Sequence, residues 1–390
     1  MGHFIPLSVP NFQGRELAYV TDAVSQGWVS SGGEYVSRFE KQVAAYTKMP
    51  GAVACQTGTA GLHLAMLLCG VRTGDLVIAP TLTFIAAVNP IRYVGAEPVF
   101  MDCDQSLCLD PEKLKSFCHE ECRFDDGILI HRATGRRVRA VVVVHVFGNM
   151  AGMEAIVDIA VKYGLLIIED ATEALGTYYT GGRLAGRMAG SLGHVGVFSF
   201  NGNKIITTGG GGMLVSGDEN TLRKAKYLST QAKDDELYYI HEEVGYNYRM
   251  TNVQAAIGVA QLEQLESFIR VKERNFALYC EIIGTDGPLR MLPFREDTRS
   301  NHWFYSLYLD LEEIGLDRDA LIQELEQRGI QGRPIWGLIH EQKPYRGSFA
   351  YHIERAFHYF ERVVNLPCST SLSEKDVEKV AYTVLEFAGR

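Results

Sequence analysis

Short runs of consecutive apolar residues constrain the fold of this chain more than any other feature. Residues 141–144 (Val-Val-Val-Val) and 165–168 (Leu-Leu-Ile-Ile) carry no polar side chain, as is typical of strands buried on both faces. Similar strands are expected at residues 77–80 and 98–102, with helical patterns at residues 86–93 and 153–163. This alternation predicts a mainly parallel sheet with helices on both faces, in which ligands bind beyond the carboxyl ends of the strands.

The character of the sequence changes after residue 251. Residues 252–283 have apolar side chains at helical spacing and are expected to form one long helix, and residues 303–311 alternate like a strand. Further helices are expected at residues 16–24, 318–327, 353–362 and 374–387. A chain of 390 residues is too long for one small core. We therefore expect a large α/β domain over residues 1–255 and a smaller α+β domain over residues 256–390, joined by the long helix.

Composition argues against several classes of protein. A net charge of −9 does not suit a nucleic-acid-binding surface, and no apolar run reaches the ~18 residues of a membrane span. The first ten residues lack the pattern of a secretory signal, and eight cysteines in this length do not resemble a disulfide framework. Two cysteines and two histidines lie close in sequence, namely Cys118, Cys122, His119 and His131. Their spacing is loose for zinc, so we expect a cytoplasmic protein without a metal, a nucleic-acid partner or a membrane partner.

One segment interrupts the alternation of strands and helices. Residues 125–138 suggest a small hairpin inserted before the strand at residues 141–144, with Thr134 and Gly135 at its turn. The simplest interpretation is a surface hairpin without a role in function.

A lysine and a carboxylate stand out as a chemical pair. Lys204 ends a turn rich in Ser, Asn and Gly just before four glycines, and Asp170 follows the strand at residues 165–168. A buried, unpaired carboxylate is costly, so Asp170 needs a partner. The pair suits pyridoxal phosphate, because the lysine can hold the aldehyde as a Schiff base and the carboxylate can keep the ring nitrogen protonated. Taken singly, a solvated lysine and a capping or ion-paired aspartate explain the two residues as well.

Other residues would complete such a site. A turn of small residues at 57–61 precedes an apolar helix, and its backbone N–H groups could seat a phosphate together with the hydroxyl of Ser199. Phe84 could stack on a planar ring, and Glu173 could reach the 3′-oxygen of that ring. Singly, such residues are more often helix caps or core residues. A dinucleotide site is not favoured, because no Gly-x-Gly-x-x-Gly lies between a strand and a helix.

Together these motifs resemble the pyridoxal-phosphate-dependent sugar aminotransferases of the DegT/StrS type, within fold type I. The likeness extends over nearly the whole chain. The segments that carry it are Trp28-Val29-Ser30-Ser31-Gly32, Phe39-Glu40, Thr57-Gly58-Thr59-Ala60, Pro80-Thr81-Leu82-Thr83-Phe84, His145-Val146-Phe147-Gly148, Glu169-Asp170-Ala171-Thr172-Glu173-Ala174, Ser199-Phe200-Asn201-Gly202-Asn203-Lys204 and Gly245-Tyr246-Asn247-Tyr248-Arg249.

The resemblance implies a role for each matched position. Lys204 would bond the coenzyme and move the proton, and Asp170 would bond the ring nitrogen, which makes these two the catalytic residues. The other residues implied to bind the coenzyme are Thr59, Ala60, Phe84, Glu173, Ser199 and Asn247. Asn247 would act from a neighbouring subunit, so the resemblance also implies a homodimer with active sites at its interface.

Residues 4–10, 170–173 and 332–336 and the insertion at 125–138 resemble a subgroup from the legionaminic acid pathway. The subgroup implies a UDP-linked 2-acetamido-4-keto-6-deoxy-hexose as the acceptor, and the hypothesis for the reaction is a transamination with L-glutamate as the amino donor. The implied substrate-binding residues are Arg333, His340 and Trp28. Arginine suits a diphosphate because its planar fork can bond two oxygens. Many family members carry glutamine at the position of Glu173, where a carboxylate would repel an ionised 3′-oxygen unless a proton is shared.

Other functions are conceivable for such a chain. In a pyridoxal-phosphate-dependent sugar dehydratase the Schiff-base lysine is usually replaced by histidine, whereas Lys204 is present here. A regulatory or sugar-binding protein on the same scaffold would show no absorbance change with glutamate. An NAD-dependent sugar dehydrogenase would need the glycine fingerprint that the sequence lacks.

Overall fold

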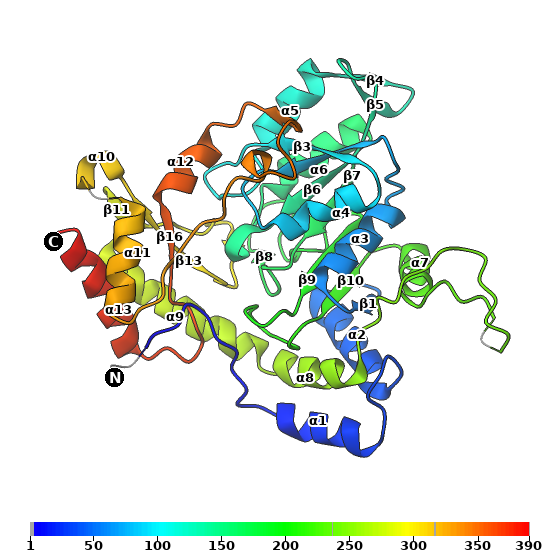
Figure 1. Ribbon diagram of the computed structural model, residues 1–390, viewed down its shortest axis with the longest axis horizontal. Helices are drawn as coiled ribbons and strands as arrows, with labels where there is room; N and C mark the ends of the chain where they lie inside the picture. Colours follow the sequence, from blue (N-terminus) through cyan, green and yellow to red (C-terminus); the bar gives the residue numbers. More distant parts are fainter. Residues whose placement is uncertain (1–3, 236, 316, 390) are drawn as a thin grey trace.

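The computed structural model describes residues 4–235, 237–315 and 317–389, and its centre is a sheet of ten strands (Figure 1). The main path of the sheet is β1 (Ala52–Cys55), β10 (Gly212–Val215), β9 (Val195–Ser199), β7 (Leu166–Asp170), β6 (Arg137–Val144), β2 (Leu76–Pro80), β3 (Glu97–Met101) and β15 (Phe349–Tyr351). Every pairing from β9 to β15 is parallel, and β10 runs antiparallel to both of its neighbours. The predicted α/β class with a mainly parallel sheet is confirmed.

Helices surround this sheet because each presents an apolar face to it or to a neighbouring helix. The largely buried α3 (Gly58–Leu68) packs against β7, β9 and β10, and α6 (Met153–Tyr163) packs against β7. The other helices of this part are α1 (Glu16–Ser25), α2 (Glu34–Thr47), α4 (Asn89–Tyr93), α5 (Pro111–Glu120) and α7 (Glu219–Ser229), with short 3-10 helices η1 (Ile85–Ala87) and η2 (Val146–Gly148). The single helix predicted at residues 86–93 is wrong: η1 and α4 share this stretch, because Pro90 lacks the N–H that would continue a helix.

A second, antiparallel sheet lies in the C-terminal part of the chain. Its order is β11 (Leu289–Met291), β13 (Tyr305–Leu309), β16 (Val363–Leu366) and β14 (Arg333–Pro334). The remaining elements here are α10 (Leu311–Ile314), α11 (Arg318–Gln327), α12 (Arg355–Arg362), α13 (Glu374–Phe387), η3 (Ile339–Glu341) and β12 (Thr298–Arg299), which pairs with β8 (Tyr178–Tyr179). The predicted domain boundary near residue 255 stays a prediction, because β15 belongs to the C-terminal part and yet extends the central sheet.

The helix predicted over residues 252–283 is interrupted. The structure has α8 (Asn252–Leu262) and α9 (Leu265–Ile283), with a tighter turn between them in which Gln264 N–H donates to the carbonyl of Gln261, three residues back. The side chains of both glutamines donate to Glu16 Oε1, at 2.6 Å and 2.7 Å. Glu16 is buried, so these contacts satisfy its carboxylate and hold the bend.

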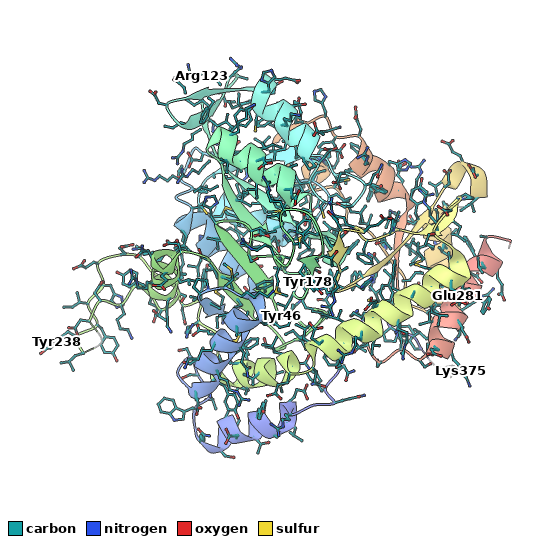
Figure 2. All side chains as sticks on the ribbon, turned by 180° about the vertical axis from the view of Figure 1, so that it is seen from behind. Tyr46, Arg123, Tyr178, Tyr238, Glu281 and Lys375 are labelled. Carbon is teal, nitrogen blue, oxygen red and sulfur yellow. The ribbon has the colours of Figure 1, made fainter. Side chains whose placement is uncertain are left out.

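The segment before β6 is longer than predicted. β4 (Cys122–Asp125) and β5 (Ile128–His131) pair through a two-residue turn at Asp126 and Gly127, whose φ values of 47° and 78° suit a tight hairpin. Thr134 and Gly135 lie in the turn between β5 and β6, which pair antiparallel, so the predicted hairpin with its turn at these residues is confirmed, and β4 adds a further strand before it. Arg123 marks the outer end of this hairpin in Figure 2. Among the described residues, no three possible metal ligands lie together, and no helix combines the length and apolar character of a membrane span.

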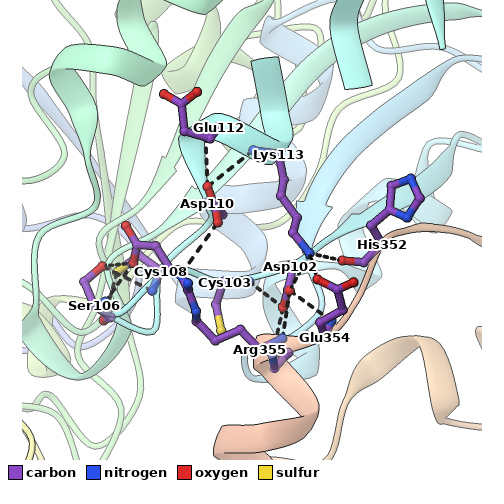
Figure 3. Close-up of polar contacts among 12 residues, drawn as sticks. Asp102, Cys103, Ser106, Cys108, Asp110, Glu112, Lys113, His352, Glu354 and Arg355 are labelled. Carbon is purple, nitrogen blue, oxygen red and sulfur yellow. Dashed lines mark hydrogen bonds and ion pairs between the residues drawn. The ribbon is translucent and has the colours of Figure 1, made fainter. Parts of the chain in front are cut away.

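A buried carboxylate connects the edge of the central sheet to the C-terminal part (Figure 3). Asp102 follows β3 and accepts hydrogen bonds from the N–H groups of Glu354, Arg355 and Ala356 at the start of α12, at 2.8–2.9 Å. Lys113 Nζ lies 3.0 Å from the same carboxylate. Burial alone would raise the pKa of Asp102, but these donors hold it below its usual value. Asp102 therefore caps a helix that lies about 250 residues away in the sequence.

Candidate active site

The carboxyl ends of β7 and β9 and the beginning of α3 surround a cavity of about 350 Å³. Because neighbouring parallel strands end at the same edge of a sheet, side chains distant in sequence meet here. The cavity is lined by Thr57, Gly58, Thr59, Phe84, Asp170, Thr172, Glu173, Ser199, Asn201, Asn203, Lys204, Trp303, Phe304 and Trp336, among others. The lysine and the two carboxylates singled out in the sequence thus share one cavity.

The N-terminus of α3 forms one end of the cavity. Thr57 caps the helix, and its Oγ1 accepts the N–H of Ala60 at 3.0 Å, so Ala60 N–H is used within the cap. Gly58 is required by a close approach, since a Cβ there would lie 2.9 Å from Ser199 Cβ. The positive end of the helix dipole and the Ser199 hydroxyl together suit an anion such as a phosphate.

Asp170 ends β7 between two hydrophobic strands. Its Cα pairs in register with Val144 on β6 and Val197 on β9, and the residue is 4% exposed. Oδ1 accepts the N–H of Thr172 at 3.1 Å. Burial raises the pKa of Asp170, whereas the contact with Thr172 and the nearby Lys204 lower it. A cationic N–H donor in the cavity would satisfy this carboxylate, and a protonated pyridine nitrogen is such a donor.

Glu173 is the second buried carboxylate. Oε2 accepts the backbone N–H of Phe147 at 2.8 Å, and Oε1 lies 3.5 Å from Lys204 Nζ. Burial raises the pKa of Glu173 from 4.5 to about 7, although the charge of Lys204 opposes the rise. A carboxyl that holds its proton near neutral pH can donate a hydrogen bond to an anionic oxygen, so a glutamate is compatible with the 3′-oxygen of the coenzyme.

The chain turns sharply beside Glu173, in the His145–Gly148 motif. Phe147 has a φ of 56° and Gly148 a φ of 88°. A Cβ at Gly148 would lie 1.9 Å from Asn301 Oδ1, so both space and backbone conformation require glycine. This turn aims the Phe147 N–H at Glu173.

Lys204 occupies a turn after β9 in which its N–H donates to Asn201 O at 3.0 Å. The side chain is 13% exposed, and Nζ lies 4.0 Å from the ring centroid of Trp303. The amine therefore lies near both a carboxylate and an aromatic face.

A buried histidine–glutamate pair supports the floor of the cavity. His145 Nε2 lies 2.8 Å from Glu169 Oε2, and both side chains are fully buried. The Ala151 N–H donates to His145 Nδ1 at 3.2 Å, so the proton is on Nε2, which donates to Glu169. The carboxylate also accepts the N–H groups of Gly190, at 2.9 Å, and Leu192, at 2.6 Å. The pair is saturated with partners and fixes the backbone beside Asp170.

Five predicted residues do not line this cavity, and one of them is Ala60, whose N–H is used within the helix cap. Trp28 and Asn247 are exposed, and so is Arg333 on β14. His340 Nδ1 lies 2.6 Å from the hydroxyl of Thr81, and its Nε2 lies 3.2 Å from Glu341. Their binding roles stay predictions.

Sequence reasoning missed the aromatic wall of the cavity. Trp303 and Phe304 were interpreted only as the start of a strand, and Trp336 only as part of a motif. A compositional signal was present, because two of the three tryptophans in the chain are at this one site. Nothing in the local sequence, however, brings residues 303 and 336 to residue 204.

The fold and the site define an enzyme of the pyridoxal-phosphate aminotransferase type. The cavity fits the coenzyme, since a helix N-terminus suits the phosphate, a buried carboxylate suits the ring nitrogen and a lysine lies beside them. The model of the DegT/DnrJ/EryC1/StrS aminotransferase family matches residues 10–385, and the chain belongs to this family. It is a pyridoxal-phosphate-dependent sugar nucleotide aminotransferase.

Several known proteins are similar over their whole length. EpsN of Bacillus subtilis, described as a pyridoxal phosphate-dependent aminotransferase, is 36% identical and covers 98% of this chain and 95% of its own. The GDP-perosamine synthase of Caulobacter vibrioides is 36% identical, with 96% of each chain covered. The crystal structure of the aminotransferase TlmJ from Streptoalloteichus hindustanus superposes with a TM-score of 0.87 at 29% identity and 99% coverage of both chains.

Proposed function

We propose that the protein transfers the amino group of L-glutamate to C4 of a nucleotide-linked 4-keto-6-deoxy-hexose, with Lys204 and Asp170 as catalytic residues. The observation that carries the proposal is the single cavity shared by Lys204, Asp170 and Glu173 at the N-terminus of α3. The product would be a 4-amino sugar nucleotide for a bacterial surface glycan or a nonulosonic acid.

When bound, pyridoxal phosphate supplies an electron sink that stabilises the carbanion left when a proton leaves the amino acid. Asp170 accepts the ring N–H and keeps that nitrogen protonated. The Lys204 amine takes the α-proton of glutamate and later delivers a proton to C4 of the sugar, so the face on which it lies sets the configuration at C4. Phe84, 54% exposed at the cavity mouth, would cover one face of the ring. Thr59 and Ser199, which line the cavity at the N-terminus of α3, would hold the phosphate.

The acceptor is the finer part of the proposal. We infer a UDP-linked 2-acetamido-4-keto-6-deoxy-hexose from the resemblance of residues 170–173 and 332–336 to the legionaminic acid subgroup. The GDP-perosamine synthases among the relatives make the GDP-linked 4-keto-6-deoxy-hexose the specific rival. Arg333, exposed on β14, would pair with the diphosphate, and His340 and Trp28 would contact the rest of the substrate.

The test of the function is incubation with glutamate and a panel of 4-keto sugars linked to UDP, GDP or TDP, with the product followed by mass and NMR. We expect amination of the UDP-linked acetamido sugar and formation of 2-oxoglutarate. Lys204→Ala should abolish both, and the exposed Lys115→Ala is the matched control. Asp170→Asn should lower turnover about a thousandfold, by about 1.4 kcal/mol per tenfold. Turnover by Lys204→Ala would refute the mechanism, whereas amination of the GDP-linked sugar alone would change only the acceptor.

We further propose a homodimer in which Asn247 reaches the coenzyme phosphate of the partner subunit. Asn247 is exposed and follows a projecting segment, described at residues 231–235 and 237–245, whose outer end is marked by Tyr238 in Figure 2. Leu237, Tyr239 and Val244 expose large apolar side chains on this segment, and a second copy of the chain would cover them.

Subunit mixing tests this arrangement. Asn247→Asp and Lys204→Ala homodimers should each be inactive or nearly so. Mixing the two under exchange conditions should restore about a quarter of wild-type activity, because half of the dimers would carry one intact site of two. A mixture that stays as inactive as its parents, although mass spectrometry detects heterodimers, would show that Asn247 acts within its own subunit.

A further inference from the structure

Trp303 makes a close contact with the side chain of Lys204. The Lys204 Nζ lies 4.0 Å from the centroid of the Trp303 ring, within the range of a cation–π interaction. The indole is 2% exposed and stacks on Phe304 at 3.9 Å with an interplanar angle of 9°. With Glu173 Oε1 at 3.5 Å, the amine is thus held in a cradle formed by one ring face and one carboxylate.

Hydrogen bonds hold Trp303 at three atoms. Its indole N–H donates to Asn203 O, the residue before Lys204, at 2.7 Å. Its backbone N–H donates to Asn301 Oδ1 at 3.0 Å, and its carbonyl accepts from the buried Lys272 Nζ at 3.0 Å. Asn301 Nδ2 donates in turn to Glu173 O at 2.9 Å. Trp303 and Glu173, the two walls of the cradle, are therefore both hydrogen-bonded to the buried Asn301 side chain, which fixes the distance between them.

We propose that Trp303 is a positioning residue for Lys204, holding the free amine in reach of the coenzyme carbon with which it must react. The inference rests on the role of Lys204 in the proposed function. An unbound lysine side chain has many rotamers, and holding it in one of them costs side-chain entropy. The face of the indole offsets part of that cost, by a cation–π interaction when the amine is protonated and by an N–H···π contact when it is neutral, and it leaves the amine free to move.

The experiment measures how fast the apoenzyme captures pyridoxal phosphate at Lys204. In this capture the amine nitrogen bonds the aldehyde carbon and the carbonyl oxygen leaves as water; borohydride then fixes the mass at Lys204. The rate is followed across a pH profile to its alkaline plateau, where the amine is neutral and only its position matters. Affinity for pyridoxamine phosphate, which has no aldehyde, reports the rest of the pocket. The variants are Trp303→Leu, without an aromatic face, and Trp303→Phe, which keeps one.

Trp303→Leu should lower the plateau rate about fivefold, which corresponds to about 1 kcal/mol. Trp303→Phe should stay within about twofold of wild type, and pyridoxamine phosphate should bind all three proteins with nearly equal affinity. An unchanged plateau in Trp303→Leu would overturn the proposal, as would an equal loss in Trp303→Phe or a parallel loss of pyridoxamine phosphate affinity. Trp303→Met replaces the leucine variant if that protein does not fold. Capture at another lysine in Lys204→Ala would instead refute the proposed function itself.

Discussion

The buried carboxyl of Glu173 should make the stability of the apoenzyme depend on pH near neutrality. Its pKa is raised from 4.5 to about 7, chiefly by burial, and the side chain is only 3% exposed in the folded chain. At about 1.4 kcal/mol per pKa unit, this shift corresponds to about 3 kcal/mol. The perturbation is Glu173→Gln, which keeps an acceptor for the Phe147 N–H and removes the titration.

The sign follows from proton binding. Between pH 4.5 and about 7 the folded chain keeps the proton on Glu173 while the unfolded chain has lost it, so the folded chain binds more protons. The stabilising contribution is therefore complete below the unfolded pKa and is lost as pH rises through the folded pKa. Relative to Glu173→Gln, the wild-type apoenzyme should lose up to about 3 kcal/mol across this window.

Two assays check this reasoning. The difference in unfolding midpoint between wild type and Glu173→Gln, followed in steps of pH, removes the titration of all other groups. The infrared C=O band of a protonated carboxyl, present in wild type and absent in Glu173→Gln, should titrate with a midpoint near 7. A carboxyl band that disappears near pH 4.5, or a pH-independent stability difference, would refute the assignment of a neutral acid to this position.

Three further outcomes are expected. Lys204→Met removes a charge that lowers the pKa of Glu173, so the infrared midpoint should move above 7; a fall would show that Lys204 is not the opposing charge. Gly148→Ala should lower the stability measured by thermal unfolding by about 3 kcal/mol. Gly135 also has a positive φ but open space around it, so Gly135→Ala should cost only about 1 kcal/mol. Equal losses in the two variants would show that the close contact at Gly148 is not the cause. Asp102→Asn should lower stability by about 2 kcal/mol at neutral pH. Because the pKa of Asp102 is depressed, this difference should shrink as pH falls through the folded pKa, and a constant difference would contradict the capping role.

The sequence was sufficient where local patterns determine structure. The apolar run at residues 141–144 lies in β6, and residues 166–168 of the second run begin β7, because a strand buried on both faces needs no polar side chain. The sequence also singled out Lys204 and Asp170 for their chemistry, and both line one cavity because strand ends of one sheet meet at one edge.

Contacts between distant segments account for what sequence reasoning missed. The break between α8 and α9 depends on Glu16, which lies far from that helix in sequence. The beginning of α12 is fixed by Asp102, and the residue at its N-cap makes no capping hydrogen bond that local sequence could have indicated. Trp303 reaches Lys204 through hydrogen bonds spread over several elements. Periodicity and propensity contain no information on such pairings.

The junction at Asp102 matters for attempts to exchange sugar specificity between relatives by swapping their C-terminal halves. A cut near residue 255 would transfer β15 without β3, the strand with which it pairs. It would also transfer α12 without Asp102, the carboxylate that caps it. A chimera would therefore have to include Asp102 and its flanking turn from the donor protein. Alternatively, single side chains around Trp336 can be substituted on the native backbone. In this enzyme the C-terminal part is joined to the central sheet through β15 and α12, and it is not a separable addition to that sheet.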